Sequence, residues 1–361
     1  MGQPEPILSA PRALRDHGFH PLEVLRVVRE TADAVSLVLD IPEPLAETFA
    51  YGAGQFCNVR VAIDGRPEMR CYSMSSSPAL AETLQVTVKR VPGGLVSNWI
   101  IDHVTAGDVV DLSPPAGYFQ LADTPGDLVA FAAGSGITPV FSLVKTALAT
   151  TARTVRLHYA NRDRASVIFA AELDGLAVRY PGRLILTHSY DVEHGLVSEP
   201  SVSAAARGAG GAADYYVCGP GPYMETVERG LAGAGVEPAR IHIERFTAAD
   251  AAAAADAAAA GPPPGPVAIT VTIDLEGRTG STGHSPGTTI LQTARQMGMA
   301  PPFSCESGNC ATCMARLVDG AVSMFVNNAL TPEEVEEGWI LTCQSVPTTA
   351  AVRVDYSLDG P

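Results

Sequence analysis

Apolar positions divide the chain into three differently patterned parts. In the first, from about residue 20 to about residue 122, short β-rich runs are separated by Gly, Pro and Asp. These runs are Val35–Leu39, Phe56–Ile63, Leu84–Val88 and Val109–Leu112. Many short strands with turn residues between them are typical of closed antiparallel sheets. We therefore expect an antiparallel β-barrel in this part.

In the second part, from about residue 125 to about residue 246, strand-like runs alternate with helical stretches. The strand-like runs are Leu128–Ala132, Val155–Tyr159, Leu184–Thr187 and Asp214–Val217. This alternation predicts an α/β domain with a parallel, doubly wound sheet. The longest apolar window, Leu128–Val144, contains Gly134, Gly136 and Pro139. It therefore predicts a strand, a turn and the start of a helix, and not a membrane span.

In the third part, Val267–Leu275 alternates with period two and Thr288–Met297 has helical spacing. An alanine-rich stretch with three consecutive prolines near its end precedes this part, and without an apolar face to bury it is most simply a spacer. The predicted division is an N-terminal arm at 1–19, a barrel at 20–123, an α/β domain at 124–247, a linker at 248–266 and a third domain at 267–361.

Four cysteines of the third part have a spacing that indicates metal chemistry. Cys305, Cys310 and Cys313 form a C-x4-C-x2-C motif, and Cys343 follows well downstream. This is the plant-type [2Fe–2S] spacing, in which four thiolates hold two irons. The Ser-Gly-Asn between the first two cysteines suits a backbone that curls around the sulfides. The alternative, a zinc ribbon, would need a second C-x2-C pair, and Cys343 stands alone.

Charge and cysteine content limit the classes of partner and the cellular location that we expect. The chain has 361 residues, a net charge of −15 and a pI near 4.9. Nucleic acid and anionic membrane would repel such a chain, so neither is an expected partner. Cys57, Cys71 and Cys218 are scattered in apolar surroundings, which favours reduced thiols and a cytoplasmic location. The first 21 residues contain no continuous apolar stretch, so no signal peptide is expected. We expect a monomer.

The strongest motif of the first part is Arg70-Cys71-Tyr72-Ser73-Met74. It resembles the flavin-binding segment of the ferredoxin-NADP reductase family. The resemblance implies that Arg70 neutralises a phosphate of the flavin cofactor, that Tyr72 packs against the flavin and that Ser73 approaches its N5 atom. An arginine fork does suit phosphate oxygens. The alternative is a β-strand that carries an ordinary Arg and Tyr.

A second segment completes the implied flavin site. It runs from a strand end at Val88 and Lys89 to a helix start at Gly94, Leu95, Val96 and Ser97. The backbone N–H groups and the dipole at a helix start bind anions. Alone, this segment is equally a plain turn with a serine cap. Because it follows the Arg-x-Tyr-Ser motif at the family's usual interval, it indicates a pyrophosphate site, and hence FAD in preference to FMN.

Two segments of the second part resemble the nicotinamide site of the same family. The first contains Gly134, Gly136 and Thr138, of which Thr138 would contact the nicotinamide; a third glycine of the dinucleotide fingerprint is missing. The second contains Cys218, Gly219, Pro220 and Met224. There the cysteine would face the site of hydride transfer to the flavin, or else it is a small core residue.

The choice between NADH and NADPH stays open in the sequence. NAD sites usually place Asp or Glu at the end of the second strand, whereas this chain has Asn161, Arg162, Arg164 and Ser166 there. The arginines and the serine either accept a 2′-phosphate or belong to a solvated loop, and Asp163 complicates both interpretations. Further on, Phe246 either shields the flavin ring, as its counterpart in the family does, or is a core aromatic residue.

The three parts, in this order, resemble the reductase components of multicomponent oxygenases, in which the third domain is a plant-type ferredoxin of α+β, β-grasp fold. Several stretches look most like the reductases of 3-ketosteroid 9α-hydroxylases, with those of phenylacetyl-CoA epoxidases as cousins. They are Val88–Ile100, Tyr159–Phe169, Ile241–Phe246, Pro302–Arg316 and Val326–Gln344.

This resemblance implies an enzyme that takes electron pairs from NAD(P)H through FAD and passes them singly through the [2Fe–2S] cluster. The partner would be a terminal oxygenase, either a Rieske protein or another non-haem iron protein. A reductase for a di-iron epoxidase or an aromatic-ring oxygenase is the runner-up. A redox sensor or carrier that retains the fold is a competing hypothesis, which the intact Arg70, Ser73, Thr138 and Cys218 disfavour.

Charge in the third part bears on the partner. The chain beyond the linker has four arginines and ten acidic residues, a balance of −6 that suits a partner with a basic surface. Thr331 and Pro332 begin a predicted helix with normal start chemistry. Its glutamates belong to a capped, solvated helix or to an acidic docking patch: Glu333, Glu334, Glu336 and Glu337.

Overall fold

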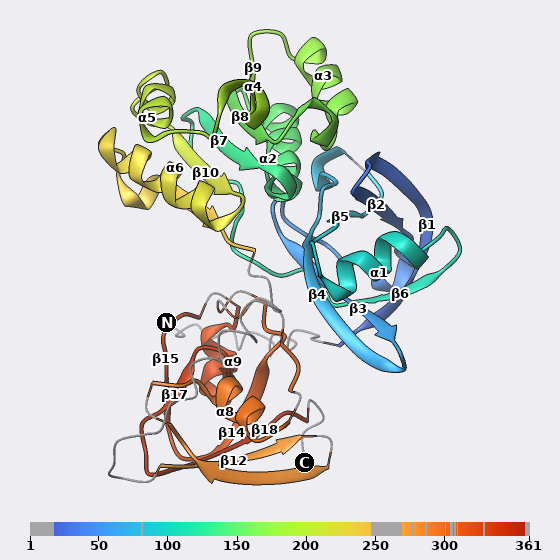
Figure 1. Ribbon diagram of the computed structural model, residues 1–361, viewed down its shortest axis with the longest axis vertical. Helices are drawn as coiled ribbons and strands as arrows, with labels where there is room; N and C mark the ends of the chain where they lie inside the picture. Colours follow the sequence, from blue (N-terminus) through green and yellow to red (C-terminus); the bar gives the residue numbers. More distant parts are fainter. Residues whose placement is uncertain are drawn as a thin grey trace, which may run out of the picture.

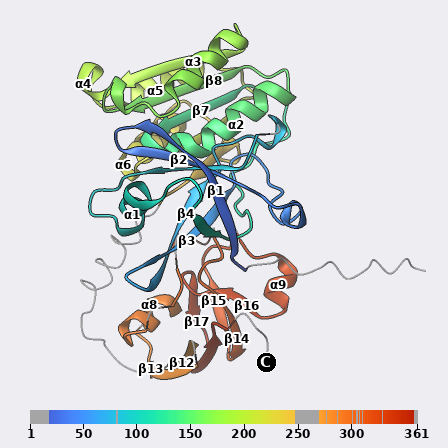
Figure 2. The same cartoon turned by 90° about the vertical axis from the view of Figure 1, so that its right-hand side faces the viewer.

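The computed structural model describes residues 18–80, 82–246, 269–275, 277–285, 287–299, 301–303, 306, 308, 310–327 and 329–357. Three folded units follow one another along the longest axis, and the first unit lies between the other two (Figures 1 and 2). The predicted linker at 248–266 and nearly all of the predicted N-terminal arm lie outside the described residues.

The first unit is an antiparallel barrel, as the sequence predicted. Its strands pair in the order β4-β3-β6-β1-β2-β5. An isolated bridge between Met74 and Val86 joins the two ends of this order. The elements are β1 (His20–Thr31), β2 (Ala34–Leu39), β3 (Phe56–Ile63), β4 (Arg66–Ser73), β5 (Gln85–Lys89), β6 (Val109–Leu112), the 3-10 turns Glu43–Leu45 and Pro78–Leu80, and helix α1 (Leu95–His103).

Strand β2 shows how the barrel packs against the second unit. Its side chains alternate in direction, because successive residues of a strand point to opposite faces. Val35, Leu37 and Leu39 belong to the core of the barrel, whereas Ala34 belongs to the core of the second unit. All six residues of the strand are buried, although it lies in an antiparallel sheet.

The second unit is a parallel, doubly wound sheet in the order β11-β10-β7-β8-β9, again as predicted. Because the strand order reverses between β7 and β10, the carboxyl ends of these two strands form the topological switch point where ligands bind in such sheets. The strands are β7 (Leu128–Ala133), β8 (Val155–Asn161), β9 (Leu184–Tyr190), β10 (Asp214–Cys218) and β11 (Ile241–Glu244). The helices are α2 (Ile137–Thr150), α3 (Ala170–Arg179), α4 (Asp191–His194), α5 (Glu199–Arg207) and α6 (Gly221–Gly233), and 3-10 turns span Gly134–Gly136, Arg164–Ser166 and Pro238–Arg240.

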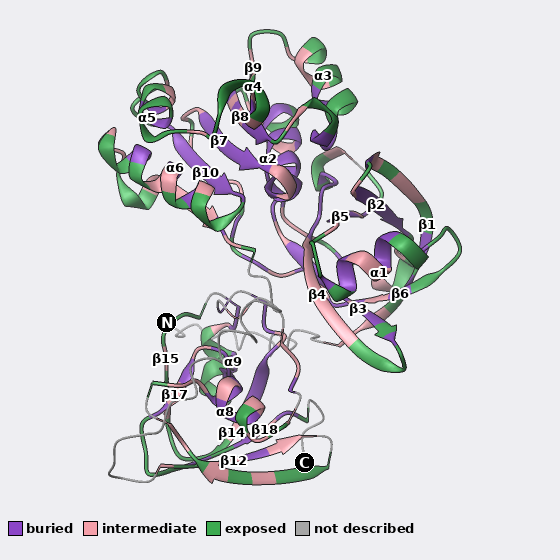
Figure 3. Cartoon of the chain, viewed as in Figure 1, coloured by how far each residue is buried: buried purple, intermediate pink, exposed green. Residues whose placement is uncertain are grey.

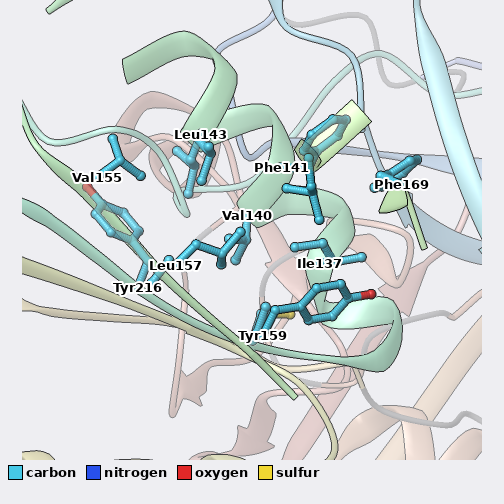
Figure 4. Close-up of a cluster of buried hydrophobic side chains, with 14 of the residues drawn as sticks. Ile137, Val140, Phe141, Leu143, Val155, Leu157, Tyr159, Phe169 and Tyr216 are labelled. Atoms are coloured by element: carbon cyan, nitrogen blue, oxygen red, sulfur yellow. The ribbon is translucent and has the colours of Figure 1, made fainter. Parts of the chain in front are cut away.

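Strand β7 separates the two cores of this unit and is buried along its whole length (Figure 3). Leu128, Ala130 and Ala132 pack in one core with α2, and this core appears in Figure 4. The alternate residues Val129 and Phe131 pack in the other core with α5 and α6. A strand that is covered on both faces needs apolar residues at every position, which explains the continuous apolar run in the sequence.

The third unit is a β-grasp domain, as expected from the resemblance. Its strands pair in the order β13-β12-β18-β14-β16. The central strand β18 is parallel to its neighbour β12, and Ile290 and Ala294 of α8 pack in the same core as these strands. The elements are β12 (Thr270–Leu275), β13 (Arg278–Gly283), α8 (Ile290–Gln296), β14 (Met314–Asp319), β15 (Val322–Met324), α9 (Pro332–Glu336), β16 (Trp339–Leu341), β17 (Ser345–Pro347) and β18 (Ala351–Asp355).

Helix α9 begins with a capping box in which Thr331 and Glu334 bond each other's backbone N–H groups. Glu334 is buried, so it serves the helix start and is not part of an exposed acidic face. In the described parts of the chain, no helix combines the length and the apolar character that crossing a membrane requires.

Candidate redox sites

The switch point of the second unit is a place where two backbones touch. A Cβ atom on Gly136 would lie 2.1 Å from the carbonyl oxygen of Cys218, and one on Gly219 would lie 3.0 Å from the Cβ of Ala133. Only glycine fits at such distances. Helix α2 begins directly after this contact. Its N-terminus and the bare backbone around it suit the pyrophosphate of a nicotinamide dinucleotide.

The loop between β7 and α2 is fixed by two hydroxyl groups. Thr138 Oγ1 donates to the carbonyl oxygen of Ser135 over 3.0 Å, and Tyr159 Oη donates to that of Gly134 over 3.1 Å. Gly134 has a φ of 53°, in the left-handed region that favours glycine. The loop is therefore preorganised, and the predicted contact of Thr138 with the nicotinamide stays a prediction.

Cys218 and Glu244 lie side by side at the carboxyl ends of β10 and β11, where they are paired in register. Burial raises the pKa of the Cys218 thiol well above its ordinary value, so the thiol is neutral near pH 7. Burial also raises the pKa of Glu244 to about 7. Sequence reasoning missed Glu244, although an acidic residue at the end of a strand that begins Ile-His-Ile was a visible signal.

Glu244 should make the stability of the protein fall as pH rises. Its pKa is 4.5 in the reference state and about 7 in the fold, so the fold disfavours the ionised form. The contribution is fully present below pH 4.5 and is lost as pH rises through about 7. Relative to Glu244→Gln, the free energy of unfolding should fall by about 3 kcal/mol between about pH 4 and pH 8. Thermal unfolding of both proteins across this range checks it, and parallel pH profiles would contradict it.

On the barrel, Ser73 has a buried hydroxyl group that is free to bond a ligand. Its side chain is 2% exposed, and its hydroxyl oxygen has no hydrogen-bond partner among the described residues. A buried, unsatisfied hydroxyl costs free energy unless a partner binds. This fits the predicted approach of Ser73 to a flavin. Next to it, Tyr72 packs on the barrel core, and Arg70 donates to the carbonyl oxygen of Met69 over 2.7 Å.

The start of α1 also fits an anion. Gly94 precedes the helix, and no side chain caps it. Ser97, instead of capping the helix, accepts a hydrogen bond from the Val91 backbone over 3.2 Å and so holds the preceding turn closed. A helix N-terminus without a side-chain cap suits the flavin pyrophosphate. Lys89 Nζ, 3.9 Å from Asp33 Oδ2, adds a positive charge at the end of the neighbouring strand β5.

At the ribose end of the expected nicotinamide site, the structure pairs the arginines with acids. Arg162 Nε lies 2.9 Å from Asp163 Oδ2, and Arg164 Nε lies 3.1 Å from Glu193 Oε1. Ser166 forms a capping box with Asp163. Asn161 is 5% exposed, and neither polar atom of its amide has a hydrogen-bond partner in the described parts of the chain. Asn161 is therefore better placed than Arg162, Arg164 or Ser166 to form a hydrogen bond with a ligand.

The remaining predicted site residues of the first two units range from fully buried to exposed. The side chains of Met74, Val88, Val96 and Met224 are buried in the cores of the first two units, and Leu95 is 45% exposed. Gly219 and Pro220 lead into helix α6. Phe246, 41% exposed, is the last described residue before the linker. The binding roles predicted for these residues stay predictions.

Three of the four predicted cluster ligands lie in the described chain, and all three are buried: Cys310, Cys313 and Cys343. The fourth, Cys305, lies outside the described residues. A hydrogen bond with Cys343 and, after it, burial raise the pKa of the Cys313 thiol well above its ordinary value. Within the described chain, no group of three or more Cys, His, Asp or Glu side chains is arranged to hold a metal ion.

Three described residues of the cysteine loop have backbone conformations in the left-handed region. Glu306, Gly308 and Ala311 all have positive φ, at 48°, 77° and 56°. Positive φ is strained for Glu and Ala, and strain of this kind gathers at functional sites. The loop is anchored by an ion pair between Arg295 of α8 and Glu306, at 2.7 Å. These backbone conformations and the buried thiols fit a [2Fe–2S] cluster.

The cysteine loop also faces the barrel. A cavity of about 750 Å³ lies between the two units and is lined by residues of both, including Arg70 and Asn58 of the barrel and Cys310 and Phe303 of the third unit. Cys310 packs against Phe56 of β3, with Cys71 of β4 alongside. The expected flavin and cluster sites are thus adjacent.

Comparisons with known families agree with this arrangement. Three family models match the chain: an oxidoreductase FAD-binding domain over residues 21–121, an oxidoreductase NAD-binding domain over 131–229 and a 2Fe-2S iron-sulfur cluster binding domain over 273–348. The three cofactor classes expected from the sequence are therefore confirmed.

Individual relatives cover nearly the whole chain. It is 38% identical to the ferredoxin reductase component of a 3-ketosteroid-9-alpha-monooxygenase from Rhodococcus rhodochrous, over 93% of this chain and 96% of the relative. It is 31% identical to one of the subunits of the 1,2-phenylacetyl-CoA epoxidase of Escherichia coli, over 95% of this chain and 99% of the relative. The solved structure of phthalate dioxygenase reductase matches with a TM-score of 0.57 and 25% identity, over 94% of this chain and 98% of that one.

Proposed function

The chain belongs to the family of oxygenase reductase components that combine FAD-binding, NAD-binding and 2Fe-2S domains, and from this premise we propose that it supplies electrons to the oxygenase of a 3-ketosteroid 9α-hydroxylase. The observation that carries the electron-transfer part of the proposal is the order of the three units. The barrel with the flavin motif lies between the nicotinamide unit and the unit with the cysteine loop (Figures 1 and 2), which suits a path from nicotinamide through flavin to cluster.

Residues of this chain have a proposed role at each step of this path. When bound, FAD accepts an electron pair from the nicotinamide and the cluster passes the electrons on singly. Gly136 and Gly219 would let the dinucleotide approach the backbone of the switch point. Cys218 would lie near the reacting carbon as a neutral thiol that adds no charge of its own there, and the unpartnered hydroxyl of Ser73 would bond the flavin edge. The buried apolar surroundings of Cys313 and Cys343 would exclude water from a cluster held there.

We also propose that NADH is the preferred electron donor. A hydrogen bond from Arg162 holds the pKa of Asp163 below its ordinary value, so this carboxylate stays ionised and would repel a 2′-phosphate. Both arginines that would otherwise bind that phosphate already have acidic partners. A monomer in the cytoplasm is the expected form of the protein.

Arg162→Ala should change the KM for NADH by less than about fivefold, because an exposed ion pair contributes at most about 1 kcal/mol. The paired variant Asp163→Ala should lower the KM for NADPH, since it removes a negative charge and releases Arg162. Steady-state reduction of ferricyanide with each nucleotide measures both. A KM for NADPH that rises much more than that for NADH in Arg162→Ala would show that the arginine does read the 2′-phosphate.

The choice of steroid oxygenase rests on the relatives and is tested by reconstitution. The purified chain, NADH and the oxygenase component of a 3-ketosteroid 9α-hydroxylase should together form hydroxylated steroid, and Cys310→Ser in place of the native chain should form none. A chain that reduces cytochrome c but supports no steroid hydroxylation would refute the steroid assignment while leaving the reductase activity in place.

The second candidate is a reductase for a phenylacetyl-CoA epoxidase, favoured by the match along nearly the whole length of the epoxidase relative. The same assay with the epoxidase oxygenase components and phenylacetyl-CoA separates the two. Faster product formation with the epoxidase than with the steroid hydroxylase would transfer the proposal to it.

A further inference from the structure

The contact between the cysteine loop and the barrel centres on one buried amide. Asn58 lies in β3 of the barrel, is 3% exposed and faces Cys71 of β4 across the sheet. Its Nδ2 donates to the carbonyl oxygen of Cys310 over 3.3 Å. Its Oδ1 accepts from Thr312 Oγ1 over 2.8 Å and from Cys71 Sγ over 3.1 Å. The amide thus joins two units that are far apart in the sequence.

The direction of these bonds fixes the orientation of the amide. A backbone carbonyl only accepts, so the nitrogen of Asn58 must face Cys310. The same nitrogen donates to Ser113 Oγ over 3.3 Å, and Ser113 Oγ also accepts from the Asn58 backbone over 2.9 Å. Ser113 therefore holds the amide from the barrel side. Both polar atoms of the Asn58 side chain are hydrogen-bonded. Two of the four side-chain hydrogen bonds, those with Cys310 and Thr312, cross to the third unit.

The position of Asn58 relates the expected flavin and cluster sites. Cys71, which bonds Asn58, lies between Arg70 and Tyr72 of the predicted flavin motif and points to the opposite face of the strand. Cys310, whose carbonyl bonds Asn58, is one of the predicted cluster ligands. Apolar contact between Phe56 and Cys310 flanks the amide. One residue therefore links the strand of the flavin motif to the loop of the cluster.

We propose that Asn58 is a positioning residue that latches the cysteine loop onto strands β3 and β4, and that this latch sets the relation between flavin and cluster during electron transfer. The inference rests on the proposed function for its role in electron transfer, but the latch itself is a structural claim. The proposal predicts that loss of the amide hydrogen bonds weakens the docking of the third unit onto the barrel without unfolding either unit.

The latch is testable through the reactivity of Cys71, which docking partly covers. In the holoprotein, the rate at which iodoacetamide alkylates Cys71 is measured by mass spectrometry. Asn58→Leu removes every side-chain bond of the latch, and Thr312→Val removes one from the other unit. Because Asn58→Leu removes both bonds that cross between the units, it should speed alkylation about tenfold, which corresponds to about 1.4 kcal/mol in total. Thr312→Val should act in the same direction with a smaller effect.

Arg60→Gln is the matched control. Arg60 is two residues further along β3 and lines the same cavity. Its ion pair with Asp111, at 2.9 Å, and its stacking over Phe19, at 4.2 Å, stay within the first unit. The alkylation rate of Cys71 should not change in this variant. Visible absorption of flavin and cluster confirms that each variant is folded, and if Asn58→Leu does not fold, Thr312→Val carries the test.

Single-turnover reduction by NADH provides the second readout. Flavin reduction should keep its rate in Asn58→Leu, whereas the following reduction of the cluster should slow. Unchanged alkylation in both variants, or faster alkylation in Asn58→Leu alone, would overturn the latch, because a local change at Cys71 would then suffice. A wild-type protein whose cluster NADH does not reduce would instead refute the proposed function, and the alkylation result would stand.

Discussion

Cys310→Ser should abolish the visible absorption of the cluster and reduce cytochrome c reduction to background, while ferricyanide reduction by the flavin persists. The thiolate is a predicted ligand, and three thiolates do not hold the binuclear centre as four do. The cores of the barrel and of the nicotinamide unit do not include this cysteine, so neither unit should need it to fold. Absorption spectra and the two assays, run on the same preparation, check the prediction.

The control for this variant is Cys57→Ala, which removes a thiol that is as deeply buried but lies in the barrel core. It should keep the cluster spectrum. Retention of the cluster in Cys310→Ser would refute the ligand assignment. Loss of ferricyanide reduction together with the cluster would show that the flavin and cluster units do not function independently.

Gly136→Ala should lower the thermal midpoint and raise the KM for NADH. The new Cβ would lie 2.1 Å from the carbonyl oxygen of Cys218 and 2.4 Å from its carbon, both backbone atoms. The turn after β7 and the carboxyl end of β10 would have to move apart where the dinucleotide is expected to bind. Overpacking of this kind costs about 1–3 kcal/mol, and the distortion falls on the site itself. Thermal unfolding and ferricyanide kinetics with varied NADH measure the two effects.

Gly175→Ala provides the comparison for this variant. Gly175 lies in helix α3, and a Cβ there would meet no atom within 4 Å. Alanine is favoured over glycine inside a helix by about 1 kcal/mol. This change should therefore raise the thermal midpoint slightly and leave the KM for NADH unchanged. If Gly136→Ala behaved like Gly175→Ala, the switch point would not be as closely packed as the structure indicates.

Several elements and motifs of this protein could be predicted because the residues that define them are close together in the sequence. The parallel strands were visible because β7 is covered on both faces and so has no polar position. The cluster loop was visible because a [2Fe–2S] centre requires cysteines at a fixed spacing. Gly136 was visible as part of a strand–turn–helix motif. In each case neighbours in the sequence carry the signal.

The sequence by itself thus determined the fold of each unit and the classes of cofactor. Only the tertiary structure decided which side chains meet and how deeply they are buried, because such contacts depend on packing and not on local pattern. It paired Glu244 with Cys218 and gave that carboxyl a raised pKa through burial. It paired Arg162 and Arg164 with acids. It also placed Asn58, unremarkable in its strand, against the loop of Cys310, which lies 252 residues further along the chain.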